Sequence, residues 1–416
     1  MMKRIIHILL SFFVIFNCAY YNTLFNAKKS FNAGIEIIQK EPEKQVHPQA
    51  NKFFEETIEK CWKLIEIYSD QSKYADDALL YIVKSEYYIG NYAQARSHVN
   101  QFIQKYPESN LVEEANLWYG KLLLKDNKIE EGKEFLTRII NTSTNSRLRA
   151  EALYELGNLA FESENYGEAI EYFEKALNEK IESQYAAFIN YYLGESYYHQ
   201  QEYKKAIDQY KKVQKFSPSL DVEYKTNYHL AKSFAETGKY DNALGVLRKM
   251  LTAPRFKGFV PSIKSEIARI TYLQGKKEIA LDLYKEIVKE RVSGVGTAEA
   301  SFRLGKIYEN EIQNVDSAVH YYGEVRKLFS KYDSVDVAEE KYFFLSELKK
   351  IRDNLKQDQY LVFKLETDSY FQDSLYTLQY EDSLYGNVTA PASQTTDTSL
   401  LNIDTSSVLY KLELDQ

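Results

Sequence analysis

The stretch Tyr154–Leu177, YELGNLAFESENYGEAIEYFEKAL, decides the fold of this chain. It contains two small residues, Gly157 and Ala169, twelve positions apart, with the polar segment Glu164–Tyr166 between them. Phe173 follows Ala169 by four positions, which places an apolar residue on the same helical stripe. Helix backbones approach closely only where side chains are small. The stretch therefore predicts two antiparallel helices joined by a tight turn that a tyrosine closes.

The same pattern recurs with a period of 37 residues. The first small site is occupied in turn by Val83, Gly120, Gly157, Gly194, Ala231, Ala268 and Gly305. The second small site is occupied by Ala95, Gly132, Ala169, Ala206, Ala243, Ala280 and, in the last unit, Ser317 or Ala318. The last unit fits best with one residue inserted before Ala318. Repetition at this period predicts an all-α solenoid of about seven helical hairpins, each burying its apolar face against the next.

At this point a family resemblance becomes clear. Residues 154–177 resemble the tetratricopeptide repeat consensus almost position by position, and residues 191–218 resemble it nearly as closely. The resemblance covers roughly residues 76–330. It implies a superhelix of antiparallel hairpins, although the period of 37 exceeds the 34 residues usual in the family. The extra residues are expected in the connections between units.

The flanking regions lack the repeat markers. We expect residues 18–75 to form an amino-terminal hairpin that caps the array of residues 76–334. Residues 335–385 are predicted to continue as a helical extension. Residues 386–416 are acidic, rich in Ser and Thr and without a helical stripe, which is typical of disorder.

The amino terminus has the pattern of a secretory signal in residues 1–17. Lys3 and Arg4 precede the apolar run Ile5–Phe16, which is shorter than the roughly 20 residues that a membrane-spanning helix needs. Cys18 follows the run, as in bacterial lipoprotein signals, although Phe16 and Asn17 depart from the small residues usual there. The resemblance implies lipidation of Cys18. The alternative is an unmodified thiol beside an uncleaved anchor.

Composition argues against several classes of function. The formal charge of −7 becomes −9 when Lys3 and Arg4 are removed with the signal, so nucleic-acid binding is not expected. The six histidines show no metal-ligand spacing, and no nucleophile motif or phosphate-binding loop is present. Cys61 lies in an apolar stripe and is expected to be a buried structural thiol. We therefore expect no enzyme activity, no metal, no cofactor and no small-molecule substrate.

Tetratricopeptide arrays present the first helix of each hairpin to a partner peptide or helix, and the resemblance carries this role to particular positions. The implied groove residues are Tyr154, Asn158, Phe161, Glu162, Tyr191, Glu195, Tyr198, His199, Tyr228 and Lys232, followed by Ala235 and Glu236. Tyrosine rings offer stiff contact area and amides satisfy extended backbones. The alternative is that many of these rings pack between adjacent hairpins.

The sequence thus favours a non-catalytic scaffold for protein–protein interaction, anchored by its lipid in a bacterial cell envelope. Its layout resembles BamD-like outer-membrane lipoproteins and those of type IX secretion and gliding systems. These resemblances imply envelope proteins as partners, an outer-membrane address facing the periplasm, and a role in outer-membrane protein assembly or secretion. A partner of peptidoglycan or Tol-Pal machinery is the alternative. An envelope enzyme or glycan-binding protein would require a catalytic constellation or an aromatic platform that the sequence does not show.

Overall fold

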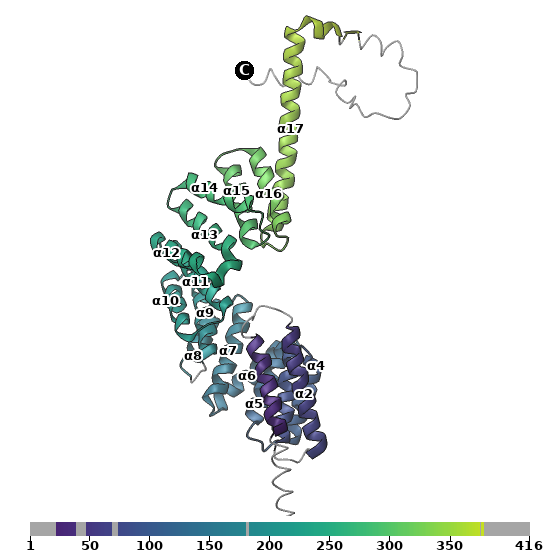
Figure 1. Cartoon of the computed structure of the whole chain (residues 1–416), viewed down its shortest axis with the longest axis vertical. Helices are drawn as coiled ribbons and strands as arrows, with labels where there is room; N and C mark the ends of the chain where they lie inside the picture. The colour runs from purple at the N-terminus through teal and green to yellow at the C-terminus, as the bar shows by residue number, and fades with distance from the viewer. Residues whose placement is uncertain (1–21, 39–46, 69–73, 180–182, 375, 378–416) are drawn as a thin grey trace, which may run out of the picture. The chain divides into compact units, whose positions relative to one another are not determined.

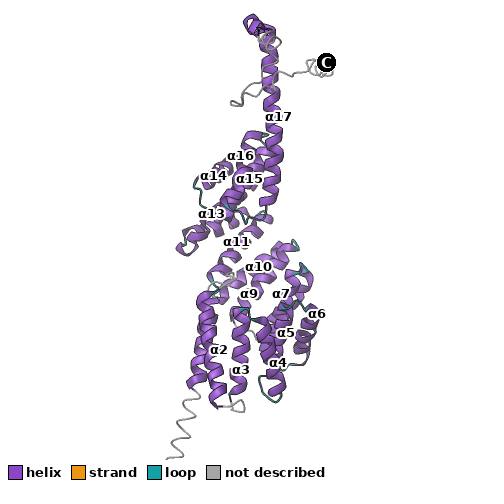
Figure 2. Cartoon of the chain, turned by 90° about the vertical axis from the view of Figure 1, so that its right-hand side faces the viewer, coloured by secondary structure: helices purple, strands orange, loops and turns teal. Residues whose placement is uncertain are grey.

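The computed structural model describes residues 22–38, 47–68, 74–179, 183–374 and 376–377, and every regular element among them is a helix (Figures 1 and 2). The chain divides into two compact units, residues 1–342 and residues 343–416. The predicted all-α class is confirmed.

Seven hairpins make up most of the first unit. Their paired helices are α3 (Ala75–Ile89) with α4 (Tyr92–Lys105), α5 (Val112–Lys125) with α6 (Ile129–Thr142), α7 (Ser146–Glu162) with α8 (Tyr166–Leu177), α9 (Ser183–His199) with α10 (Tyr203–Val213), α11 (Leu220–Glu236) with α12 (Tyr240–Thr252), α13 (Val260–Leu273) with α14 (Lys277–Lys289), and α15 (Val295–Asn310) with α16 (Val315–Leu328). The short helices η1 (Gln214–Phe216) and η2 (Pro254–Phe259) follow α10 and α12. Each hairpin contacts the next along the chain, so the array is a solenoid.

The turns inside the hairpins share one backbone feature. One residue in the turn that follows the first helix adopts a positive φ in each hairpin, at Gly90, Asn127, Glu164, Gln201, Gly238, Gly275 and Gln313. The first six lie 37 residues apart and the seventh lies 38 after the sixth, which confirms the residue inserted in the last unit. Left-handed backbone is easiest for glycine, and polar residues tolerate it in short turns.

The small sites bring the two helices of a hairpin together as predicted. A Cβ added at Gly157 would lie 2.5 Å from Phe173 Cε1, and one added at Gly194 would lie 2.6 Å from Tyr210 Cε1. Phe173 and Tyr210 are fully buried. An aromatic ring of the second helix thus occupies the space that the missing side chain of the first helix leaves.

Helices flank the array on both sides. Upstream, residues 22–38 are helical and α2 spans Pro48–Tyr68, and α2 packs against α3. Downstream, α17 runs from Val335 to Thr367 as one unbroken helix. Asp368 follows the end of α17, and the Asp368 Oδ1 atom accepts a hydrogen bond from the Phe371 backbone amide at the start of the next helical stretch. Within the described residues, the predicted extension to residue 385 therefore consists of α17 and a second helical segment that reaches residue 374, with residues 376–377 also helical. Residues 378–385 and the predicted tail at 386–416 lie outside the described residues.

No helix within the described ranges is both long enough and apolar enough to cross a membrane. The predicted signal peptide and Cys18 lie outside those ranges.

Candidate binding surface

The first helices of consecutive hairpins lie next to one another. α3 contacts α5, α5 contacts α7, and the same holds onward to the contact between α13 and α15. The predicted groove residues come from α7, α9 and α11, which are three neighbours in this row. The row of first helices, α3, α5, α7, α9, α11, α13 and α15, is called the first-helix row below.

In α7, Tyr154 is held inside the stack. Its ring packs edge-on against Tyr185, with ring centroids 5.7 Å apart, and lies 6.3 Å from Phe173. Asn158 Oδ1 is buried without a hydrogen-bond partner. Burial raises the pKa of the Tyr154 phenol well above its ordinary value. Tyr154 therefore joins the hairpin of α7 to the hairpin of α9.

Phe161 and His199 also contact the neighbouring helix. The Phe161 ring lies 5.3 Å from Tyr192 of α9 in an edge-to-face arrangement. His199 stacks on Tyr166 of α8, with ring centroids 4.4 Å apart and planes within 3°. Both His199 and Glu162 remain exposed to solvent. At this end of the predicted surface, the half-buried Phe161 ring thus lies among aromatic side chains, while Glu162 and His199 face solvent.

Glu195 and Tyr191 are buried within the stack of hairpins. Glu195 is 5% exposed, and its Oε1 atom is the hydrogen-bond partner of both the Tyr210 hydroxyl and His229 Nδ1. Burial, together with the neighbouring Glu195 carboxylate, raises the pKa of Tyr210 well above its ordinary value. Tyr191 is also buried. Glu195 connects the second helix of its own hairpin to the first helix of the next.

Tyr198, Tyr228 and Lys232 form a half-buried cluster. The Lys232 Nζ atom lies 5.4 Å from the centroid of the Tyr198 ring and 5.9 Å from that of Tyr228, within the range of a cation–π interaction. Within the described residues, Lys232 makes no ion pair with a carboxylate. Of the last two predicted positions, Ala235 is buried and Glu236 is exposed, 3.2 Å from Arg269. Tyr198, Tyr228 and Lys232 are together called the Lys232 cluster below.

One column of the first-helix row was only partly anticipated from the sequence. The residue directly after each first small site is Lys84, Lys121, Asn158, Glu195, Lys232, Arg269 or Lys306. The predicted groove residues include the middle three, Asn158, Glu195 and Lys232, where the family resemblance is strongest. The 37-residue register alone would have identified the other four.

Most charges in this column are paired across or within hairpins. Lys84 Nζ lies 2.5 Å from Glu114 Oε1, and Arg269 lies 2.7 Å from Glu266. Lys121 Nζ lies 2.8 Å from Glu155 Oε1. The pairs of Lys84 and Lys121 connect first helices of neighbouring hairpins, whereas the Arg269–Glu266 pair lies within α13. Each pair gives an inner cation a carboxylate partner, which offsets the cost of its burial.

Lys121 is the most enclosed cation of the column. Burial opposes its charge, but Glu155 and neighbouring tyrosines keep the pKa of the ammonium well above its ordinary value. The Nζ atom also lies 4.3 Å from the Trp118 ring centroid, and Trp118 Nε1 is buried without a hydrogen-bond partner. Lys121 is thus a buried cation enclosed by aromatic rings.

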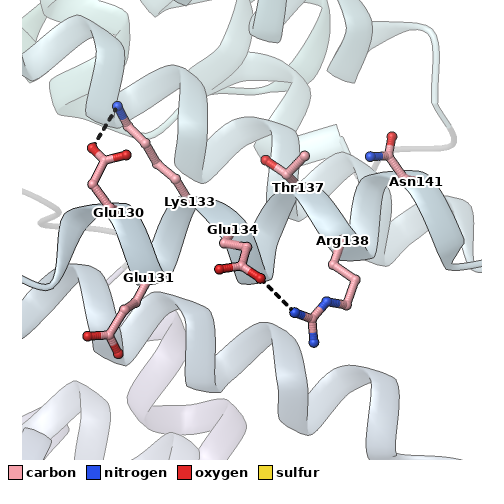
Figure 3. Close-up of a pocket in the computed structure, with 7 residues that line it drawn as sticks. All are labelled: Glu130, Glu131, Lys133, Glu134, Thr137, Arg138 and Asn141. Atoms are coloured by element: carbon pink, nitrogen blue, oxygen red, sulfur yellow. Dashed lines mark hydrogen bonds and ion pairs between the residues drawn. The ribbon is translucent and has the colours of Figure 1, made fainter.

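A shallow depression on α6 lies outside the first-helix row (Figure 3). A single helix lines it, and its charges pair locally, Lys133 with Glu130 at 3.8 Å and Arg138 with Glu134 at 2.9 Å. Local pairs on one helix face are typical of a solvated surface. This depression shows no arrangement of groups for catalysis or ligand binding.

Among the described residues, no group of three or more His, Cys, Asp or Glu side chains is placed to hold a metal ion. Cys61 is fully buried, and burial raises the pKa of its thiol from 9.0 to about 12.

The geometry defines an all-α solenoid whose first helices present a continuous row, the architecture of a protein-interaction array. The tetratricopeptide repeat model matches residues 77–109 and 299–332, and a model for subunit 3 of the anaphase-promoting complex, or cyclosome, matches residues 162–250. The chain contains tetratricopeptide repeats, as the resemblance implied. Repeats of this family imply a scaffold for protein–protein interaction.

Several solved structures align with the chain. A tetratricopeptide repeat protein from Parabacteroides merdae aligns with a TM-score of 0.45 and 14% identity over 65% of this chain and 98% of that chain. The C-terminal part of a repeat protein from Cytophaga hutchinsonii aligns with a TM-score of 0.38 and 17% identity, over 69% and 95%. The Cut9–Hcn1 hetero-tetramer of the anaphase-promoting complex gives 0.41 and 15%, over 72% and 54%. No curated protein matches the chain.

Proposed function

We propose that this chain is a non-catalytic scaffold, anchored by a lipid on Cys18 in the outer membrane of a bacterium and facing the periplasm, where it supports outer-membrane protein assembly or secretion. Its partners would be envelope proteins that lay a peptide or a helix along the first-helix row. The repeat array supports the scaffold role. The signal-like residues 1–17 support the address.

The single observation that carries the binding role is the Lys232 cluster. Its lysine is half-buried between two tyrosine rings and makes no ion pair within the described residues, in contrast to Lys84, Lys121 and Arg269 of the same column. A lysine ammonium group that lies over tyrosine rings has already lost part of its hydration on folding. The free energy of desolvation that remains is therefore small when it binds a carboxylate or an aromatic side chain of a partner. We infer that the Lys232 cluster is the anchor point of the partner.

Tyr154, Tyr191 and Glu195 play a different part in this proposal. Their side chains join neighbouring hairpins, so they shape the row that the partner contacts. Substituting them would test folding together with binding. Lys232 is the better probe, because its removal leaves the interhelical ion pairs intact.

A partner in the peptidoglycan or Tol-Pal machinery is the alternative. The same anchor and the same row would serve it, and only the identity of the bound protein distinguishes the two functions.

The test is crosslinking in living cells followed by mass spectrometry, with the unaltered chain, Cys18→Ala, Lys232→Met and the control Lys249→Met. Lys249 is an exposed lysine on α12, the second helix of the same hairpin. We expect partners from one envelope machine with the unaltered chain and with Lys249→Met, and their loss with Lys232→Met. Cys18→Ala is expected to release the chain from the membrane fraction. Equal capture by Lys232→Met and the control would contradict the binding site, and membrane retention of Cys18→Ala would contradict the lipid anchor.

A further inference from the structure

The carboxyl-terminal unit carries an exposed apolar stripe on α17. Phe344, Leu348, Ile351 and Leu355 are 66%, 43%, 63% and 56% exposed. At 3.6 residues per turn they fall within about 60° of arc around the helix. Soluble helices seldom leave four large apolar side chains in line on one open face. These four residues are called the α17 seam.

The spacing of the seam identifies the kind of surface that fits it. Steps of four, three and four residues follow the heptad repeat, with Leu348 and Leu355 at a positions and Phe344 and Ile351 at d positions. A globular core accepts a wider stripe with a period near 3.6, whereas a strict a and d pattern fits another helix with the same pattern. The partner that fits the α17 seam is therefore another helix, parallel or antiparallel to α17, with apolar residues at its own a and d positions.

Flanking charges select a second copy of this chain. Glu347 occupies a g position and Arg352 the e position of the following heptad. In a parallel, in-register pair these two face each other across the interface, and the two-fold symmetry forms the contact twice. We propose that the chain self-associates through a parallel coiled coil of α17, with the seam of one copy against the seam of another.

A charged residue limits how far the paired helices can extend beyond the α17 seam. Asp358 occupies the next d position after Ile351, so two carboxylates would face each other there in the parallel pair. Like charges at facing positions oppose pairing. Self-association is thus reversible, and its strongest part lies between Phe344 and Leu355. Leucine at a with isoleucine at d also favours more than two strands, so trimers and tetramers agree with the proposal as dimers do.

This inference stands apart from the proposed function, because it requires neither the lipid anchor nor the Lys232 cluster. The experiment measures the mass of the purified full chain against its concentration, by analytical ultracentrifugation in a detergent that suits a lipidated protein. The disrupting variant is Leu348→Glu/Ile351→Glu. The control is Phe363→Glu, which introduces one negative charge, against two in the disrupting variant, at a residue of α17 that is 60% exposed and off the seam.

We expect the unaltered chain and Phe363→Glu to associate alike, and Leu348→Glu/Ile351→Glu to lower the association constant by at least about a hundredfold, since charges replace buried contacts. Circular dichroism should show unchanged helix content, because the substituted side chains are exposed in the single chain. A chain that stays monomeric at the highest concentration overturns the proposal, as does equal disruption by the control.

A charge exchange tests the parallel register. Glu347→Lys alone and Arg352→Glu alone should each weaken association several-fold, and Glu347→Lys/Arg352→Glu should restore it. Asp358→Leu should strengthen association by at least about tenfold, because it removes the facing carboxylates. Failure of the double exchange to restore association, or weakening by Asp358→Leu, overturns the parallel pairing of copies.

Discussion

Lys121 Nζ lies 2.8 Å from Glu155 Oε1, and this ion pair joins the first helices of two consecutive hairpins. The Lys121 side chain is 7% exposed and that of Glu155 is 19% exposed. Few ion pairs in the array are as enclosed. Because a solenoid has only nearest-neighbour contacts, one such pair bears directly on the stability of a single interface.

Lys121→Met should destabilise the interface between α5 and α7 by about 2 kcal/mol, since it leaves the Glu155 carboxylate partly buried without its cation. The figure lies below that for a fully enclosed pair because water still reaches Glu155. Lys121→Met/Glu155→Leu should recover most of the loss. Hydrogen exchange of the α5 and α7 amides measures both effects. If the α5 and α7 amides exchange as fast in the double variant as in Lys121→Met, the loss of stability does not come from the unpaired Glu155 carboxylate.

Gly194→Ala should lower the stability of its hairpin by about 1–3 kcal/mol, because the added methyl group would meet the buried Tyr210 ring 2.6 Å away. Gly245→Ala is the matched control. Gly245 lies within α12 with no atom within 4 Å of an added Cβ, so the same change there should raise stability by about 0.5–1 kcal/mol through helix propensity. Urea denaturation followed by circular dichroism compares the two. Equal effects would show that the close helix approach does not need glycine.

The chain should unfold in alkali as buried tyrosines ionise. Burial raises the pKa of Tyr224 from 10.0 to about 12 and raises those of Tyr154 and Tyr210 well above the ordinary value. The folded chain therefore holds protons that the unfolded chain releases above about pH 10. The stability from these phenols is fully present below that pH and is lost as pH rises through the folded pKa values. Tyrosinate absorbance and helical circular dichroism, recorded together, should change in one step. Complete ionisation with the helices intact would contradict this.

Cys61 should not react with thiol reagents until the chain unfolds. Its thiol is fully buried, and the rise of its pKa from 9.0 to about 12 lowers the thiolate fraction near neutral pH by about a thousandfold. A colorimetric thiol assay in buffer and in urea measures this. With Cys18 lipidated, the native full chain should show no fast-reacting thiol. A fast thiol that disappears in Cys18→Ala would show that Cys18 is unmodified, whereas one that persists would contradict the burial of Cys61.

Lys232→Met should abolish partner capture while changing the unfolding free energy by less than about 1 kcal/mol, because exposed or half-exposed cation–π contacts contribute little to folding. Partner capture is read from crosslinking and stability from urea denaturation of the same variant. Loss of capture together with a large loss of stability would assign Lys232 to the fold instead of the binding site.

The repeat, the hairpin and the inserted residue of the last unit can all be predicted from the amino-acid sequence. These features depend on contacts between residues close in the chain: Gly157 must face Phe173 sixteen positions later, and both lie within one hairpin. Because each hairpin has the same steric requirement, small residues recur at a fixed spacing in the sequence. The turn at Gln313, 38 residues after Gly275, was readable for the same reason.

Only the tertiary structure decided which side chains of the first-helix row face solvent. Glu195 and Lys232 occupy equivalent positions one period apart, yet Glu195 is buried against Tyr210 and His229 while Lys232 lies half-buried over two rings. Identical register predicts equal exposure, but exposure depends on the size and charge of residues contributed by the neighbouring hairpin. His229 lies 34 residues beyond Glu195. Periodicity places a side chain on a face of its helix, and packing between hairpins then determines how much of that side chain solvent can reach.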